Sequence, residues 1–219
     1  MKKERLIEPE ILDGTSDVMA AGSLRDLRSI NRWLGGHLVT RWAFRQIRHP
    51  QGRITVLDVG AASGDNGREI RAVWPRATVI SLDLLRRNLE GASAPRLVAD
   101  AFQLPLAERS VDFVFCSLFL HHFTDEAVVR LLEGFRHVAR YGVVVNDLER
   151  HWFAHKSTPV FGWLFGWNAV TLHDAPVSVQ AGFTAKELRA LAERAGISSA
   201  RVRGHLPWFR LSMVWERAR

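Results

Sequence analysis

Two adjacent histidines, His121 and His122, follow the apolar run VDFVFCSLFL, and Asp147 follows a second apolar run, GVVVN. An imidazole changes charge near neutral pH, so a histidine is suited to accept a proton from a reacting group. A carboxylate can act as that base itself or hold a histidine in the required orientation. These three residues are the candidate catalytic groups, and the sequence leaves open which of them is the base.

A second group of candidate residues surrounds a turn in the stretch ITVLDVGAASGDNGREI, residues 54–70. Asp58, Gly60 and Gly64 follow the spacing D-x-G-x-x-x-G, between an apolar β-branched run and a segment with helical character. Dinucleotide sites ordinarily show G-x-G-x-x-G, and Ala62 stands at the middle glycine position, which weakens a nicotinamide interpretation. The turn still lies where ligands of open α/β sheets bind, between a strand end and a helix N-terminus.

The next predicted strands also end in residues suited to a nucleoside. Asp83 follows VISL, where a carboxylate can accept both hydroxyls of a ribose. Asp100 and Phe102 follow LVA, and Ser117 ends the fourth strand. Because the carboxyl ends of parallel strands meet at one edge of a sheet, we predict a single binding site there.

The elements that must position these residues form an α/β pattern from residue 53 onward. Short apolar runs alternate with amphipathic segments, as a parallel sheet covered on both faces requires. Strands are predicted over 54–59, 78–82, 96–99, 111–118 and 142–146, with a final hairpin over 200–203 and 211–216.

Helix signals flank this core. Leu24 to Trp42 repeats apolar residues at three- and four-residue steps, with an interruption at Gly35-Gly36 and a stop at Pro50, which predicts two helices or one bent helix. Thr124 is a predicted N-cap of a helix, and a later helix opens with a capping box at Thr184 and closes at Gly196.

Composition and charge bound the class of protein. The 219 residues, 47% hydrophobic and 24% charged, fit one soluble domain. No apolar run approaches the roughly 20 residues that a membrane-spanning helix needs, and the first residues contain no apolar signal core, so we expect a cytoplasmic location. The single cysteine, Cys116, excludes an intrachain disulfide and a cysteine-based metal site, and we predict no metal. The net charge of +7 comes mostly from scattered arginines, which argues against a nucleic-acid partner.

As a set, the motifs resemble those of the class I S-adenosylmethionine-dependent methyltransferases. VLDVGAASG is similar to their first motif, LDL to their acidic second-strand motif, DAFQLP to the adenine-contacting motif, and SVDFVFCSLFLHHF to the fourth-strand motif. The resemblance covers residues 53–147 and departs from the commoner first motif at Ala62. It implies a Rossmann-like, doubly wound, seven-stranded sheet with an antiparallel last strand, S-adenosyl-L-methionine as cofactor and S-adenosyl-L-homocysteine as product.

The resemblance also implies roles by position. The glycine turn would contact the methionine part of the cofactor, Asp58 would orient its amino group, and Ser117 would lie on the sulfonium side. Asp83 would bind the ribose, and the residues around Asp100 the adenine. The full set of implied cofactor-binding residues is Asp58, Gly60, Ala61, Gly64, Asp83, Leu84, Asp100, Ala101, Phe102 and Ser117.

We expect one methyltransferase domain over 1–219, with an N-terminal helical cover (1–50), a cofactor-binding core (53–148), a lid insertion (149–182) and a C-terminal helix and hairpin (183–219). The insertion is rich in aromatic residues, which predicts a lid over an apolar or aromatic acceptor. A buried helix, a dimer contact and a membrane-surface element are its competing interpretations. The candidate substrate-binding residues are Trp33, Trp152, Trp163 and His173.

The predicted function is methylation of a small hydrophobic or aromatic acceptor at oxygen or carbon, with a histidine as general base. The pattern is most similar to methyltransferases of ubiquinone and menaquinone biosynthesis and of aromatic natural-product pathways. One alternative is an RNA or protein methyltransferase that uses the basic surface. Another is a cofactor-binding protein without catalysis, or an NAD oxidoreductase.

Overall fold

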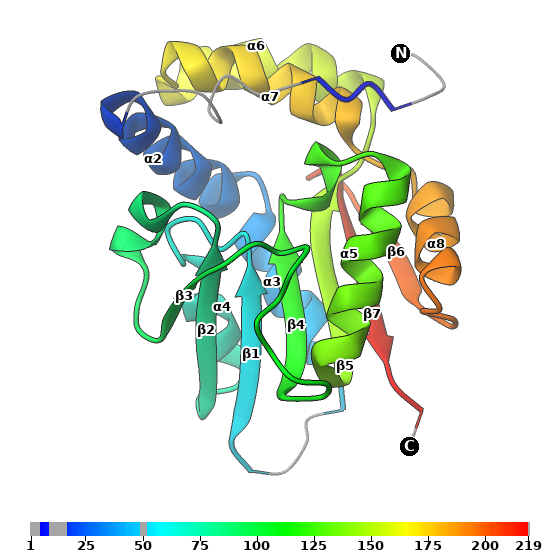
Figure 1. Ribbon diagram of the computed structural model, residues 1–219. Coiled ribbons are helices and arrows are strands. Elements are labelled where there is room, and N and C mark those ends of the chain that lie inside the picture. The colour runs from blue at the N-terminus through cyan, green and yellow to red at the C-terminus, as the bar shows by residue number, and fades with distance from the viewer. Residues whose placement is uncertain (1–4, 9–16, 49–51, 219) are drawn as a thin grey trace.

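The computed structural model describes residues 5–8, 17–48 and 52–218, and a seven-stranded sheet lies at its centre (Figure 1). The sheet has the order β3-β2-β1-β4-β5-β7-β6, with the first five strands parallel and β7 antiparallel to both of its neighbours. This topology confirms the predicted fold. The strands are β1 Ile54–Val59, β2 Ala77–Asp83, β3 Arg96–Val98, β4 Val111–Ser117, β5 Ala139–Leu148, β6 Arg201–His205 and β7 Arg210–Glu216.

Helices cover both faces of the sheet, which explains why its central strands are continuous apolar runs. On one face lie α5 (Asp125–Val138) and α8 (Ala185–Arg194), and on the other lie α3 (Gly36–Arg45) and α4 (Asn66–Val73), as Figure 1 shows. Val114 and Phe115 are both fully buried although their side chains point to opposite faces. Two hydrophobic layers therefore hold the central strands in place.

The predicted break in the N-terminal helical segment is confirmed. One helix, α2, covers Asp17–Trp33, and α3 begins at Gly36. The predicted stop at Pro50 lies outside the described residues.

The predicted insertion after β5 consists of two helices, α6 (Trp152–Phe165) and α7 (Ala169–Ala181). They lie over the carboxyl ends of the parallel strands, beside α2 (Figure 1). Trp163 on α6 is 82% exposed, so α6 is not an ordinary buried helix.

The fifth strand is longer than the sequence predicted. It pairs with β4 on one side and with β7 on the other, and the pairing with β7 extends to Leu148 opposite Arg210. Asp147 therefore lies within the strand and not just past it.

Two short 3-10 helices connect strands to the elements that follow them. They are η1 (Arg86–Gly91), after β2, and η2 (Leu120–His122), after β4. The second carries both candidate histidines, so their positions depend on the end of β4.

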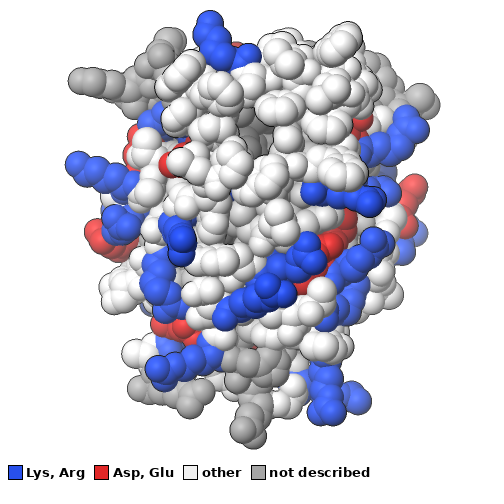
Figure 2. Space-filling view, turned by 180° about the vertical axis from the view of Figure 1, so that it is seen from behind, with Lys and Arg blue, Asp and Glu red and all other residues white. Residues whose placement is uncertain are grey.

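Charged side chains are interspersed on the surface. Figure 2 shows lysines and arginines separated by acidic and uncharged residues on the rear face, and an upper part of that face with few charges. Several arginines have acidic partners, such as Arg201 with Glu216 and Arg41 with Glu69. This distribution agrees with the scattered arginines seen in the sequence. No helix in the described part of the chain is long and apolar enough to cross a membrane.

The capping box that starts α8 generates the first prediction. The Thr184 hydroxyl accepts a hydrogen bond from the Glu187 N–H at 3.3 Å, and the Glu187 carboxylate accepts one from the Thr184 N–H at 2.7 Å. Thr184→Ala removes the first of these, so we expect the free energy of unfolding in urea to fall by about 1 kcal/mol. Thr184→Ser keeps the hydroxyl and should stay near wild type; equal losses in both variants would contradict the capping role.

Candidate active site

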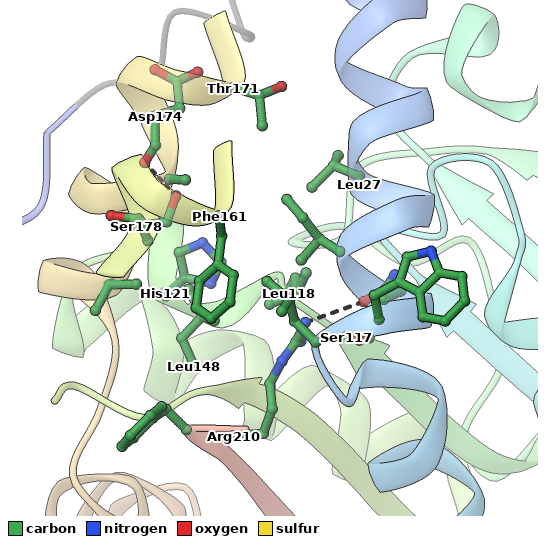
Figure 3. Close-up of a pocket in the computed structure, with 18 of the residues that line it drawn as sticks. Leu27, Ser117, Leu118, His121, Leu148, Phe161, Thr171, Asp174, Ser178 and Arg210 are labelled. Carbon is green, nitrogen blue, oxygen red and sulfur yellow. Dashed lines mark hydrogen bonds between the residues drawn. The ribbon is translucent and has the colours of Figure 1, made fainter. Parts of the chain in front are cut away.

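A cavity of about 490 Å³ lies above the carboxyl ends of β1, β4 and β5. The turn after β1, η2 and Leu148 form its floor, while α2, α6 and α7 form its roof. The turn between β6 and β7 closes one side with residues 207–210. Figure 3 shows these walls, in which apolar side chains such as Leu27, Leu118 and Phe161 predominate. The volume is in the range of small-molecule sites.

The turn after β1 can form only with glycine at two positions. Gly60 has φ +65° and Gly64 has φ +67°, and a side chain at either would collide with its surroundings. A Cβ at Gly60 would lie 2.4 Å from the Phe119 ring, and one at Gly64 would lie 2.6 Å from the Ala92 Cβ. The D-x-G-x-x-x-G spacing therefore reflects steric requirements of this turn.

Ala62, the departure from the commoner motif, also has a positive φ of +46°. This conformation is unfavourable for alanine, so the surrounding structure must hold it. The Ala62 N–H donates to Asp83 Oδ2 at 3.1 Å, which ties the turn to the end of β2. The turn thus keeps the left-handed conformation that glycine would adopt.

Asp83 is largely committed to the chain itself. Besides Ala62, it accepts hydrogen bonds from the Leu85 N–H and the Asn88 side chain, both at 3.0 Å. A carboxylate can accept about four hydrogen bonds, so capacity for a ligand hydroxyl remains.

Two buried acids beside the turn differ in their tendency to ionise. Burial raises the pKa of Asp58 well above its ordinary value, and Asp65 and Asp83 raise it further. The Asp58 Oδ2 atom has no hydrogen-bond partner among the described residues. For Asp65, burial would also raise the pKa, but hydrogen bonds from His37 and Asn31 outweigh it and lower the pKa. Asp65 therefore favours its ionised form, which is suited to a ligand with positive charge.

His121 and Asp147 form a buried pair at the floor of the cavity. The distance from His121 Nδ1 to Asp147 Oδ1 is 2.6 Å, and both side chains are almost fully buried. His122 stacks on His121 with 4.3 Å between ring centroids. Both histidines line the cavity, and Figure 3 shows His121 beside Phe161 and Leu148.

Asp147 also holds the backbone around the histidines. Its Oδ2 accepts from the Leu120 N–H at 2.9 Å and the Phe119 N–H at 3.3 Å, and its Oδ1 accepts from the Leu148 N–H at 2.8 Å. Burial would raise the pKa of Asp147, but the charge and hydrogen bond of His121, together with the Leu148 N–H and His122, lower it. An ionised Asp147 can only accept at His121 Nδ1, so the ring carries a proton on that atom, and in the neutral form of His121 the lone pair lies at Nε2.

The structure brings only part of the predicted site residues to the cavity wall. Of the implied cofactor-binding residues, Gly60, Ala61 and Ser117 line it, and Asp58 lies buried in β1. Those at the ends of β2 and β3 lie outside the cavity wall, as does Gly64; the set is Gly64, Asp83, Leu84, Asp100, Ala101 and Phe102.

Among the candidate substrate-binding residues, Trp33 lines the cavity, but Trp152, Trp163 and His173 do not. These three lie on the outer faces of α6 and α7. Helical periodicity places other residues of the same two helices on the inner faces. The inner faces present Phe153, Ala154, Ser157, Thr158, Phe161, Phe165, Val170, Thr171, Asp174, Ala175, Ser178 and Val179.

Sequence reasoning missed three contributors to this site. Arg5 donates to the Ala181 carbonyl at 2.8 Å and to the His121 carbonyl at 3.2 Å, so the N-terminal segment joins the end of the lid to η2. Asn31 and Arg210 lie in the cavity wall itself. No local motif marks these residues, although the i, i+4 spacing in α6 could have identified the inner face of the lid.

Several buried polar atoms of the cavity wall have no hydrogen-bond partner within the described part of the chain. They are Ser117 Oγ, Trp167 Nε1, Thr171 Oγ1 and Arg210 Nη1. A mostly apolar cavity with a few convergent polar groups is typical of a small-molecule site. No group of three or more His, Cys, Asp or Glu residues that could hold a metal ion occurs in residues 5–8, 17–48 and 52–218.

Comparison with known proteins agrees with this architecture. A family described as "Methyltransferase domain" matches residues 56–142, which include the turn after β1, both histidines and α5. Among solved structures, the plantazolicin methyltransferase BpumL in complex with SAH superposes with a TM-score of 0.68 and 14% identity, covering 94% of this chain and 93% of that chain. Human N-acetylserotonin methyltransferase in complex with SAM has a TM-score of 0.66 and 14% identity, covering 93% of this chain and 57% of that chain.

Curated relatives share part of the core. The malonyl-[acyl-carrier protein] O-methyltransferase of Xylella fastidiosa is 35% identical over 95 residues, 40% of this chain and 32% of that protein. The enzyme of the same name from Laribacter hongkongensis is 39% identical over 100 residues, 38% of this chain and 33% of that protein. The aligned regions span about a third of the length of these relatives.

The sheet has the fold of solved S-adenosylmethionine-dependent methyltransferases, and the matched methyltransferase domain covers the part of the chain from β1 into β5. The resemblance seen in the sequence is confirmed over residues 56–142 by the match to a methyltransferase domain, and the fold is shared with solved methyltransferases.

The buried pair of Asp147 and His121 leads to a prediction about the stability of the fold. Because the pKa of Asp147 is lowered in the folded protein, its stabilising effect is complete above the ordinary carboxyl pKa of about 4 and is lost as the pH falls through the folded-state value. We expect Asp147→Asn to lower the free energy of unfolding by about 3 kcal/mol at pH 7. The difference from wild type should narrow below about pH 4 in urea titrations at pH 7, 5 and 3. A difference that is constant across this range would contradict an ionised Asp147.

Proposed function

We propose that this protein transfers the methyl group of S-adenosylmethionine to a hydroxyl oxygen of a small hydrophobic acceptor, with His121 as the general base. The observation that carries the proposal is the buried His121–Asp147 pair at the floor of a cavity that also contains the glycine turn. The names of the curated relatives, O-methyltransferases over the shared core, support oxygen as the methylated atom.

The residues around the turn suit the cofactor. Asp65, whose pKa is lowered, complements positive charge. The unpartnered Asp58 Oδ2 can accept a hydrogen bond from the cofactor, and the Ser117 hydroxyl lies unpartnered at the end of β4. Asp83 keeps hydrogen-bonding capacity for a ribose, and Phe102, 39% exposed at the end of β3, offers a ring face to an adenine. The bound cofactor would supply an already activated methyl group, so the protein has to position the acceptor and remove its proton.

His121 is the better candidate for the base than His122 or Asp147. Asp147 is fully buried, ionised and occupied by four hydrogen bonds, which leaves it the role of orienting His121. Its contact fixes the lone pair of neutral His121 at Nε2, the atom that would take the proton of an acceptor hydroxyl. The imidazolium so formed is stabilised by the same carboxylate.

The roof supports a hydrophobic acceptor. The inner faces of α6 and α7 present aromatic rings, with Phe161 and Phe165 stacked at 6.2 Å between centroids. An apolar enclosure favours acceptors with an aromatic or aliphatic body and excludes water from the reacting groups. A cavity beneath the helices α2, α6 and α7, together with interspersed surface charges, favours a small molecule over RNA or a protein as acceptor.

Substitution of the histidines tests the base. His121→Asn should lower kcat by about 10²- to 10³-fold with little change in the dissociation constant for S-adenosylhomocysteine, because only proton removal is lost. His122→Asn is the matched comparison and should have a much smaller effect on kcat. Turnover is measured with an acceptor found by screening phenols for methylation with labelled cofactor, and binding by calorimetry. Normal turnover in His121→Asn would contradict the base and would favour an acceptor that needs none, such as a carboxylate.

Substitution of Asp83 tests cofactor binding. Asp83→Ala removes the ribose acceptor and the hydrogen bond that holds Ala62, so the dissociation constant for S-adenosylhomocysteine should rise about 10- to 100-fold in calorimetry. Glu108→Ala, at an exposed acid, is the control and should bind as wild type does. If both variants bind equally well, the cofactor is not held at the end of β2.

A further inference from the structure

Arg210 is the largest side chain that is fully buried, at 1% exposure, and it lines the cavity. Its Nη2 atom lies 3.5 Å from Asn31 Oδ1, which is long for a hydrogen bond, and Nη1 has no partner among the described residues. Figure 3 shows the side chain extending from the start of β7 toward Leu118 and Ser117.

A buried guanidinium without a close anion is costly for the folded protein. Burial lowers the pKa of Arg210 to about 10, while Asp147 and Asp65 raise it only by attraction over a longer range. The group is therefore still charged at neutral pH. A buried cation without a close anion is expected where a bound ligand supplies the missing negative charge.

We propose that the acceptor carries a carboxylate that binds the guanidinium of Arg210 while its hydroxyl faces His121. This inference rests on the proposed function and narrows the acceptor to a hydroxy acid with an aromatic or apolar body. A guanidinium presents two parallel N–H donors that match a carboxylate, and a desolvated pair of this kind is strong.

The position of Arg210 in the sheet favours the acceptor as the source of the carboxylate. Arg210 pairs with Leu148 across β5 and β7, directly beside the pairing of Asp147 with Leu211. Arg210 and Asp147, which contacts His121, thus lie at neighbouring positions of the adjacent strands β7 and β5. The proposed ribose and adenine contacts lie at the ends of β2 and β3, on the other side of β1 and β4.

The walls between these groups are apolar. Leu118, Leu148 and Phe161 line the same cavity as Arg210 and His121 (Figure 3). They suit the body of the acceptor, with its two polar ends bound at the cation and at the imidazole.

The test compares acids with their methyl esters in wild type and in Arg210→Met. The probes are 2-, 3- and 4-hydroxybenzoate and 3-(4-hydroxyphenyl)propanoate, each paired with its ester, in calorimetry with saturating S-adenosylhomocysteine. In wild type we expect at least one acid to bind tenfold or more tightly than its ester. Arg210→Met should remove this preference, and Arg210→Lys should retain part of it. The proposal is overturned if no acid binds more tightly than its ester, or if the preference survives in Arg210→Met.

A second arm separates the acceptor from the cofactor, which also has a carboxylate. S-adenosylhomocysteine carries this group, and 5′-methylthioadenosine lacks it. If the acceptor is the partner of Arg210, Arg210→Met changes both dissociation constants by the same small factor. A selective loss of tenfold or more for S-adenosylhomocysteine would assign Arg210 to the cofactor and overturn the proposal.

These binding measurements do not depend on turnover. His121→Asn should keep the preference for acids, so a wrong base assignment and a wrong role for Arg210 give different results. If Arg210→Met does not fold, the comparison of acids with esters in wild type and in Arg210→Lys decides whether Arg210 binds the carboxylate.

Discussion

The site depends on the carboxylate of Asp147, which is buried in the strand β5. It accepts hydrogen bonds from two backbone N–H groups of the segment after β4, from the N–H of Leu148 and from the His121 ring. One charged group thereby fixes the end of β4 against the end of β5 and sets the orientation of a histidine in the cavity floor. Without it the backbone of η2 would lose its anchor, and the His121 ring would lose its defined tautomer.

The rest of the fold surrounds the Asp147 carboxylate and the His121 ring. Parallel strands bring the turn after β1 and the segment after β4 to one edge, and the antiparallel β7 adds Arg210 to the same cavity. Segments far apart in the chain close the top, since α2 precedes the core and α6 and α7 follow β5 (Figure 1). Arg5 joins the roof of the cavity to its floor, because it contacts both the end of α7 and η2. Exclusion of water strengthens each polar contact, so a few groups can determine which ligand binds.

Much of this architecture could be predicted from the sequence. The glycine spacing has a steric origin in the turn, and the Thr184–Glu187 capping box is a local pattern, so both were evident without coordinates. Asp147 was predicted as a catalytic candidate, but the sequence left open whether it is the base or the residue that orients a histidine. The 2.6 Å contact with His121 favours the orienting role.

Residues that act through tertiary contacts were not predictable. Trp152 and Trp163 were expected to bind substrate from aromatic content alone, and the structure places them on the outer face of α6 because helix orientation depends on packing against α7. Arg210 looks like any surface arginine in the sequence. Its burial follows only from the strand pairing of β7 with β5.

The central claim, that Asp147 prepares His121 as a base, is tested most directly by the tautomer of His121. Long-range ¹H–¹⁵N correlation spectra of protein labelled at histidine, assigned with His121→Asn, distinguish the two ring nitrogens. We expect neutral His121 to carry its proton on Nδ1 and to show an unprotonated Nε2. A spectrum with the proton on Nε2 would contradict the claim, because that nitrogen could then not accept a proton from the acceptor.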